Sequence, residues 1–175
     1  MDYYEVDFCI KPEYKPDKWN NLQKDIMEYT NCYSYAFGRQ EEGREDKLQP
    51  GNLSGTEFKT YECNEIINKT YMDHPYMKKI NGINEPVPCN HYKIALVLDN
   101  TGEKKDYHWY RKDDNGYWSH KSGKDPITNL DASGKKIKNP ELSDRNYDKK
   151  KNDKYNYNIF CGYFSVPHEN DPLIN

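Results

Sequence analysis

One cysteine, Cys32, lies where a polar stretch gives way to a short run of aromatic and small residues. The polar segment 29–31 offers an N-cap, and apolar residues recur over 33–37 at the spacing of one helical face, so we predict a helix that begins at Cys32. Free amides and the helix dipole at such a position stabilise a thiolate and can hold an oxyanion. We therefore interpret Cys32 as a nucleophile. The alternative is a small buried hydrophobe, which is what most free cysteines are.

A cysteine nucleophile needs a neighbouring base, and histidine is the side chain best suited to that task at neutral pH. The chain has five histidines. Three of them have structural interpretations, because His74 precedes a proline at a helix end, His91 lies in a proline-rich loop and His168 lies near the C-terminus. His108 and His120 differ, since they fall on the two arms of one predicted hairpin, where cross-strand and diagonal neighbours interact. They are the candidate partners of the cysteine.

The register of this hairpin decides whether the two histidines share a face. A three-residue loop over 114–116, with Gly116 in the left-handed conformation, would pair Tyr110 with His120 and make His108 its same-face diagonal neighbour. A two-residue loop would pair Arg111 with His120 and send the histidines to opposite faces. In that second case the residues left to orient His108 are Ser119, Asn129 and Asp131.

The remaining elements must place the cysteine helix against this hairpin. Apolar residues at helical intervals predict helices over 19–29 and 59–72. Alternating or continuous apolar runs predict strands over 3–10, 92–99, 106–112, 117–121 and 159–166. Turn-rich, charged sequence over 39–55 and 123–158 indicates long loops. We expect three consecutive antiparallel strands after the cysteine helix, and the strand over 159–166 to close the sheet.

Length and composition favour one soluble domain over the whole chain, 1–175, with a core over about 19–166 and a polar C-terminal tail. The mean hydropathy of -1.24 is low, but 17 tyrosines supply amphipathic area that such scales undervalue. A net charge of -3 argues against a general phosphate-binding surface, so nucleic acid is not an expected partner.

The five cysteines form no CxxC pair and have no zinc-type spacing, so we expect neither a metal nor a cofactor. Four of them could pair and leave Cys32 free, but the sequence does not fix the connectivity of Cys9, Cys63, Cys89 and Cys161. No apolar run is long enough to span a membrane, and the first residues lack signal-peptide character. We therefore expect a cytoplasmic protein. That setting would keep the thiols reduced, but the sequence leaves the disulfide state open.

A helix-borne cysteine followed by antiparallel strands with histidines on the second and third resembles the papain-like cysteine hydrolases, especially their NlpC-type peptidase branch. The resemblance implies an α+β fold in which the cysteine-bearing helix packs on a small antiparallel sheet. It also implies that Cys32 is the nucleophile, His108 the general base and His120 the residue that orients it. The sequence departs from that pattern, because Asn31-Cys32-Tyr33 replaces the usual Asp-Cys-Ser and a long loop precedes the strands.

Segments from about residue 31 to 166 are also similar to small, mostly uncharacterised microbial proteins, some labelled insecticidal-toxin-complex components. These segments are 31–33, 49–51, 106–111, 118–121 and 131–134. From the residues and the first resemblance together we predict a cysteine hydrolase, a peptidase or amidase that acts on peptide or amide substrates through a thioester. The alternatives are acyl transfer on the same fold and a non-catalytic module that binds a protein or glycan through its Tyr- and Trp-rich sheet.

Overall fold

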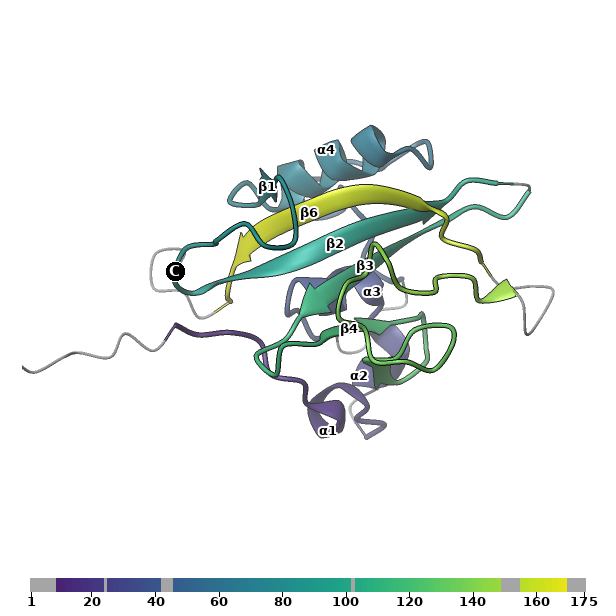
Figure 1. The fold of residues 1–175 in the computed structure, drawn as a ribbon. Helices are drawn as coiled ribbons and strands as arrows, with labels where there is room; N and C mark the ends of the chain where they lie inside the picture. The colour runs from purple at the N-terminus through teal and green to yellow at the C-terminus, as the bar shows by residue number, and fades with distance from the viewer. Residues whose placement is uncertain (1–8, 24, 42–45, 102, 149–154, 170–175) are drawn as a thin grey trace, which may run out of the picture.

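A computed structural model describes residues 9–23, 25–41, 46–101, 103–148 and 155–169 (Figure 1). Its centre is a six-stranded antiparallel sheet in the order β1-β6-β2-β3-β4-β5. The strands are β1 (Lys78–Ile80), β2 (His91–Asp99), β3 (Asp106–Lys112), β4 (Trp118–Lys121), β5 (Ile127–Thr128) and β6 (Ile159–Pro167). The helices are α1 (Pro16–Trp19), α2 (Ile26–Tyr29), α3 (Cys32–Ala36) and α4 (Cys63–Asp73).

The predicted fold class is wrong. We expected a papain-like, NlpC-like α+β domain built from a cysteine helix on a small sheet. The sheet instead dominates the described chain, and α1, α2 and α3 have only four or five residues each. One reason is that α3 ends at once, because Gly38 takes a φ of 73° that stops the helix. The other is that β1 and β5 extend the sheet beyond the strands that the sequence indicated.

Both faces of the sheet are covered, which explains why β2 is apolar along its length. Ile94, Leu96 and Leu98 face the cluster that includes α3 and α4, whereas Ala95 and Val97 face a second cluster. Figure 1 shows α4 running alongside β6 and β2. A strand buried on both sides reads as a continuous hydrophobic run, because neither face meets water.

The structure has two short helices where we predicted one. We expected a single helix from Trp19 to Tyr29, but Asp25 is left-handed, with a φ of 55°, and separates α1 from α2. Trp19 and Ile26 are buried in the same small cluster, while Leu22, which completed the helical pattern, is 69% exposed. The expected strand over 3–10 falls mostly outside the described residues, and residues 9 and 10 are not in a strand.

The structure confirms the hairpin register that follows from a three-residue loop. Arg111 pairs with Ser119 and Lys112 with Trp118, and Gly116 has a φ of 84°. The Tyr117 carbonyl accepts from the Asp113 amide at 3.0 Å, which closes the loop. His108 and His120 therefore lie on one face of the sheet, as this register requires.

Candidate active site

Asn31 fixes the start of the cysteine helix. Its side-chain oxygen accepts from the Ser34 amide at 3.0 Å, and its side-chain nitrogen donates to the Leu48 carbonyl at 2.7 Å. The first contact caps α3, as predicted from the polar lead-in. The second ties the cap to the polar loop that follows, so that Cys32 occupies a fixed position in the first turn.

The two histidines form a directed chain of hydrogen bonds. His108 Nε2 lies 2.8 Å from His120 Nδ1, and His120 Nε2 lies 3.0 Å from the Leu130 carbonyl oxygen. A carbonyl only accepts, so His120 Nε2 carries a proton, and in a neutral ring its Nδ1 is then the acceptor. His108 Nε2 must therefore donate. A neutral His108 is left with an unprotonated Nδ1, which is the lone pair that a general base uses.

Burial keeps both rings neutral. It lowers the pKa of His120 to about 4, against the opposing effect of the Leu130 carbonyl. It lowers the pKa of His108 well below its usual value, and the neighbouring His120 adds to that effect. The tautomers assigned from the hydrogen bonds are thus those expected near neutral pH.

The Cys32 thiol lies beside the backbone of β3, at residues that precede the pairing of β3 with β4. Its sulfur donates to the Tyr107 carbonyl at 3.9 Å and is also near the backbone amide of Trp109. It therefore contacts the backbone of the two residues that flank His108 in the strand. We expected a hydrogen bond from Cys32 to His108, and none is formed between these two described residues. Burial raises the pKa of Cys32 to about 12, with Asp106 adding to the rise. The resting pair is a neutral thiol and a neutral imidazole.

Cys32, His108 and His120 line one open pocket with a volume of about 440 Å³. This size suits a small ligand or a short peptide segment. Four tyrosines contribute to its wall, namely Tyr107, Tyr147, Tyr155 and Tyr157. Amphipathic rings of this kind bind apolar groups while their hydroxyls remain hydrogen-bonded.

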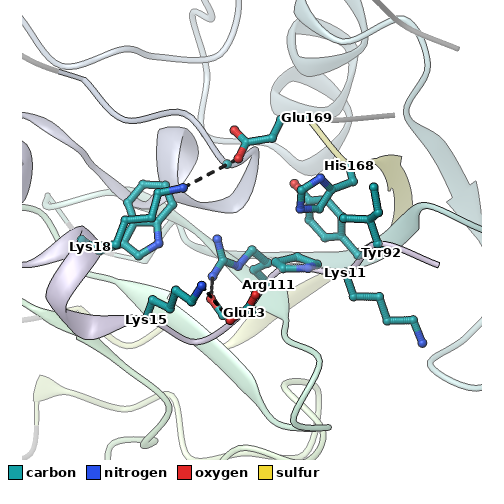
Figure 2. A pocket seen from close by; sticks show the side chains of 12 residues that line it. Lys11, Glu13, Lys15, Lys18, Tyr92, Arg111, His168 and Glu169 are labelled. Atoms are coloured by element: carbon teal, nitrogen blue, oxygen red, sulfur yellow. Dashed lines mark hydrogen bonds and ion pairs between the residues drawn. The ribbon is translucent and has the colours of Figure 1, made fainter. Parts of the chain in front are cut away.

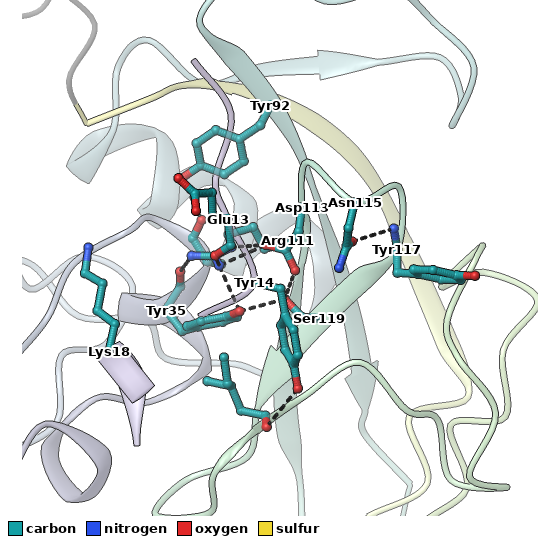
Figure 3. A network of polar contacts seen from close by, with 12 residues as sticks. Glu13, Tyr14, Lys18, Tyr35, Tyr92, Arg111, Asp113, Asn115, Tyr117 and Ser119 are labelled. Atoms are coloured by element: carbon teal, nitrogen blue, oxygen red, sulfur yellow. Dashed lines mark hydrogen bonds and ion pairs between the residues drawn. The ribbon is translucent and has the colours of Figure 1, made fainter. Parts of the chain in front are cut away.

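A buried polar network joins the cysteine helix to the histidine hairpin (Figure 3). Arg111 pairs with Asp113 at 2.9 Å and donates to the Tyr35 hydroxyl at 2.9 Å. The Tyr35 hydroxyl meets Ser119 at 2.6 Å, and Ser119 donates to the Asp113 carboxylate. Tyr35 belongs to α3 and the other three to the hairpin, so the network sets how the two elements meet. Its signal in the sequence is an arginine within an aromatic strand and an aspartate just after that strand, a signal absent from our sequence-based prediction.

The alternative orienting residues have other roles. Asp131 accepts from the Ser133 and Lys135 amides at 2.9 and 3.0 Å and thereby organises its own loop. The Asn129 carbonyl accepts from the Ile137 amide at 2.9 Å. Ser119 belongs to the network with Arg111. Because His120 already meets His108, none of these is needed to orient the His108 ring.

A second pocket lies beside the N-terminal segment (Figure 2). It has a volume of about 230 Å³, and Arg111 and several lysines line it. Two of its lysines face carboxylates, since Lys15 lies 2.8 Å from Glu13 and Lys18 lies 3.8 Å from Glu169. No cysteine lines it, so it lacks the candidate nucleophile that distinguishes the Cys32 pocket.

Two disulfides account for the other four cysteines. Cys9 pairs with Cys89 and Cys63 with Cys161, which leaves Cys32 as the free cysteine. Disulfides persist in oxidising compartments and are rare in the cytosol, so this finding argues against the cytoplasmic location that we expected. In the described part of the chain, no helix has the length and apolar character to cross a membrane.

Comparison with known proteins adds one relative. The chain is 35% identical over 132 residues to insoluble matrix shell protein 1 of Ruditapes philippinarum, and the alignment covers 75% of this chain and 80% of that protein. No family model and no solved structure matches the chain. These findings do not concern peptidases, so the resemblance to cysteine hydrolases stays a prediction.

Proposed function

This chain belongs to the same family as insoluble matrix shell protein 1 of Ruditapes philippinarum, and we propose that it is a member with cysteine-dependent acyl chemistry, hydrolysing a peptide or amide bond through a thioester on Cys32. The observation that carries the proposal is the hydrogen-bond chain from Leu130 through His120 to His108. It leaves His108 Nδ1 as a free base in the pocket that Cys32 lines.

The proposed reaction begins from the neutral pair. Cys32 sulfur attacks the substrate carbonyl carbon while its proton passes to His108 Nδ1, and the Cys32 amide in the first turn of α3 holds the oxyanion. The protonated His108 then donates to the leaving amine as the carbon–nitrogen bond breaks. Water, deprotonated by His108, attacks the thioester, releases the acid and restores the thiol. His120 holds the His108 ring and its tautomer throughout.

Acylation of Cys32 by p-nitrophenyl esters, followed by intact mass spectrometry, tests the proposal. We expect one acyl group on the protein, absent in Cys32→Ala. In His108→Ala the acylation rate should fall on the order of a hundredfold or more, because the base is lost. His91→Ala is the matched control and should not change the rate. Equal acylation rates in His108→Ala and the unaltered protein would remove the basis for a catalytic base.

The cellular setting that we propose follows from the disulfides and from the family. Two disulfides suit a secreted protein, and the relative is by name a protein of an insoluble matrix. We therefore place the site in an oxidising, extracellular setting, where its substrates would be peptides or amides.

A second candidate function is that of a non-catalytic matrix component, which the relative's name favours. Exposed aromatic residues such as Tyr76, which is 58% exposed, would then make the protein contacts. Sedimentation of the purified protein with matrix material separates the two. If Cys32→Ser sediments as the unaltered protein does while Tyr76→Ala stays soluble, assembly does not use the pocket.

A further inference from the structure

We propose that Lys47 makes the Cys32 pocket selective for acyl groups with a carboxylate close to the reacting carbonyl, as in an aspartyl or glutamyl peptide. The inference rests on the proposed function, since it names the substrate class of the same site. It is carried by a lysine on the pocket wall whose ammonium has no hydrogen-bond or ion-pair partner within the described chain.

The position of this ammonium suits ligand binding. Lys47 Nζ lies 3.7 Å from the point where a β-carbon on Gly123 would stand, and Gly123 itself lines the pocket. Because Gly123 has no side chain, nothing from that residue covers the charge. Lys47 is only partly exposed, and burial lowers its pKa, with Lys124 adding to the effect. A partly desolvated cation without a counterion gains most from an incoming carboxylate.

The other cations near the pocket are already engaged. Lys121 donates to two backbone carbonyls, and Lys124 pairs with Glu28 at 2.7 Å. Lys47 is therefore the cation that remains available to a ligand among the described residues on this side of the pocket.

Two carboxylates also line the pocket and could cancel this charge. Asp106 accepts from the Tyr157 hydroxyl at 2.6 Å. Burial raises the pKa of Asp106 and so disfavours its carboxylate form. Asp125 is exposed, so water and salt screen its field. Neither lies within ion-pairing distance of Lys47. We therefore expect the cation to dominate recognition next to Cys32.

Two small alkylating agents test this preference without any enzymatic turnover. Iodoacetate and iodoacetamide both form a carbon–sulfur bond to Cys32 with loss of iodide, and they differ in one carboxylate. The ratio of their rates, divided by the same ratio for the unfolded chain, measures attraction of anions to the pocket. Lys47→Met should lower this ratio on the order of tenfold, the effect of one partly screened charge at short range. Lys47→Arg should keep it.

The matched control is Lys124→Met, which removes the same charge from a lysine that pairs with Glu28. It should leave the ratio within about twofold, because that charge is exposed and already paired. Similar decreases in both methionine variants would show a general surface field and overturn the assignment to Lys47. No decrease in Lys47→Met would overturn it as well.

Ester substrates separate this inference from the proposed function. p-Nitrophenyl succinate carries a carboxylate that p-nitrophenyl butyrate lacks, so Lys47→Met should reduce the acylation rate only for the succinate. If alkylation depends on Lys47 but neither ester acylates Cys32 faster than in His108→Ala, the proposed function fails while anion recognition stands. If acylation depends on His108 but not on Lys47, the selectivity inference alone fails.

Discussion

The neutral resting state of Cys32 predicts how its reactivity depends on pH. Burial raises the pKa of this thiol from an ordinary 9.0 to about 12, and the thiolate is the species that reacts. Three units reduce the thiolate fraction at pH 8 about a thousandfold. The intrinsic nucleophilicity of the thiolate rises with its pKa, and this increase raises the rate about twentyfold. The folded protein should therefore react about fiftyfold more slowly than the unfolded chain, before any effect of restricted access.

The assay is alkylation by iodoacetamide from pH 6 to 10.5, followed by mass spectrometry. Cys32 is the free thiol, so each added mass reports on this residue, and the reference is the disulfide-intact chain in urea. The logarithm of the rate should rise with unit slope throughout, because the group titrates above the range. That slope does not depend on how easily the reagent reaches the thiol, so it is a safer measure than the absolute rate.

A plateau in the rate that begins below pH 7 would refute this reasoning. It would show a thiolate paired with a protonated His108, and therefore an environment in which charge attraction exceeds desolvation. His108→Ala identifies that case, since it would abolish such a plateau but would leave a unit slope unchanged.

Three further predictions concern stability, each measured by urea unfolding. Replacing Cys63 and Cys161 with serine should lower the free energy of unfolding by up to about 4.7 kcal/mol, because that disulfide closes a loop of 98 residues. Asp113→Asn should cost about 3–5 kcal/mol, since it leaves the buried Arg111 without its counterion; a loss below about 1 kcal/mol would contradict a tight buried pair. Between pH 7 and 5 the folded state should lose about 2 kcal/mol through His120 alone, because its pKa is lowered to about 4 and stability falls as protons bind the unfolded chain; His120→Asn should remove about that part of the dependence, while the lowered pKa values of His108 and His74 maintain the rest.

Local signals in the sequence were sufficient for the central strands and the hairpin. β3 spans the residues that we predicted, because an aromatic run is bounded by turn residues on both sides. The loop that ends at Gly116 predicted the hairpin but left two registers open, because a glycine with a positive φ suits both a two-residue and a three-residue loop. These features depend on neighbours within a few residues, so they could be predicted from a single sequence.

Features that depend on distant segments could not be predicted. β1 has three residues and exists because it pairs with β6, which follows more than 75 positions later. The disulfide partners are 80 and 98 residues apart, and four cysteines allow three pairings. The break between α1 and α2 likewise depends on the burial of Trp19 and Ile26 in one cluster with the distant Ile127. No local periodicity encodes such contacts.

The raised pKa of Cys32 also reconciles a free thiol with an oxidising compartment. Disulfide exchange begins with attack by a thiolate, so a thiol that is neutral at physiological pH attacks neighbouring disulfides slowly. Cys32 is 7% exposed, and at rest its thiol donates only to the Tyr107 carbonyl, which cannot take up the proton. The same burial that makes Cys32 a slow reagent toward iodoacetamide would thus protect it between catalytic cycles. Under the matrix alternative the protection would serve no reaction, and Cys32→Ala would cost only the packing of a small buried side chain.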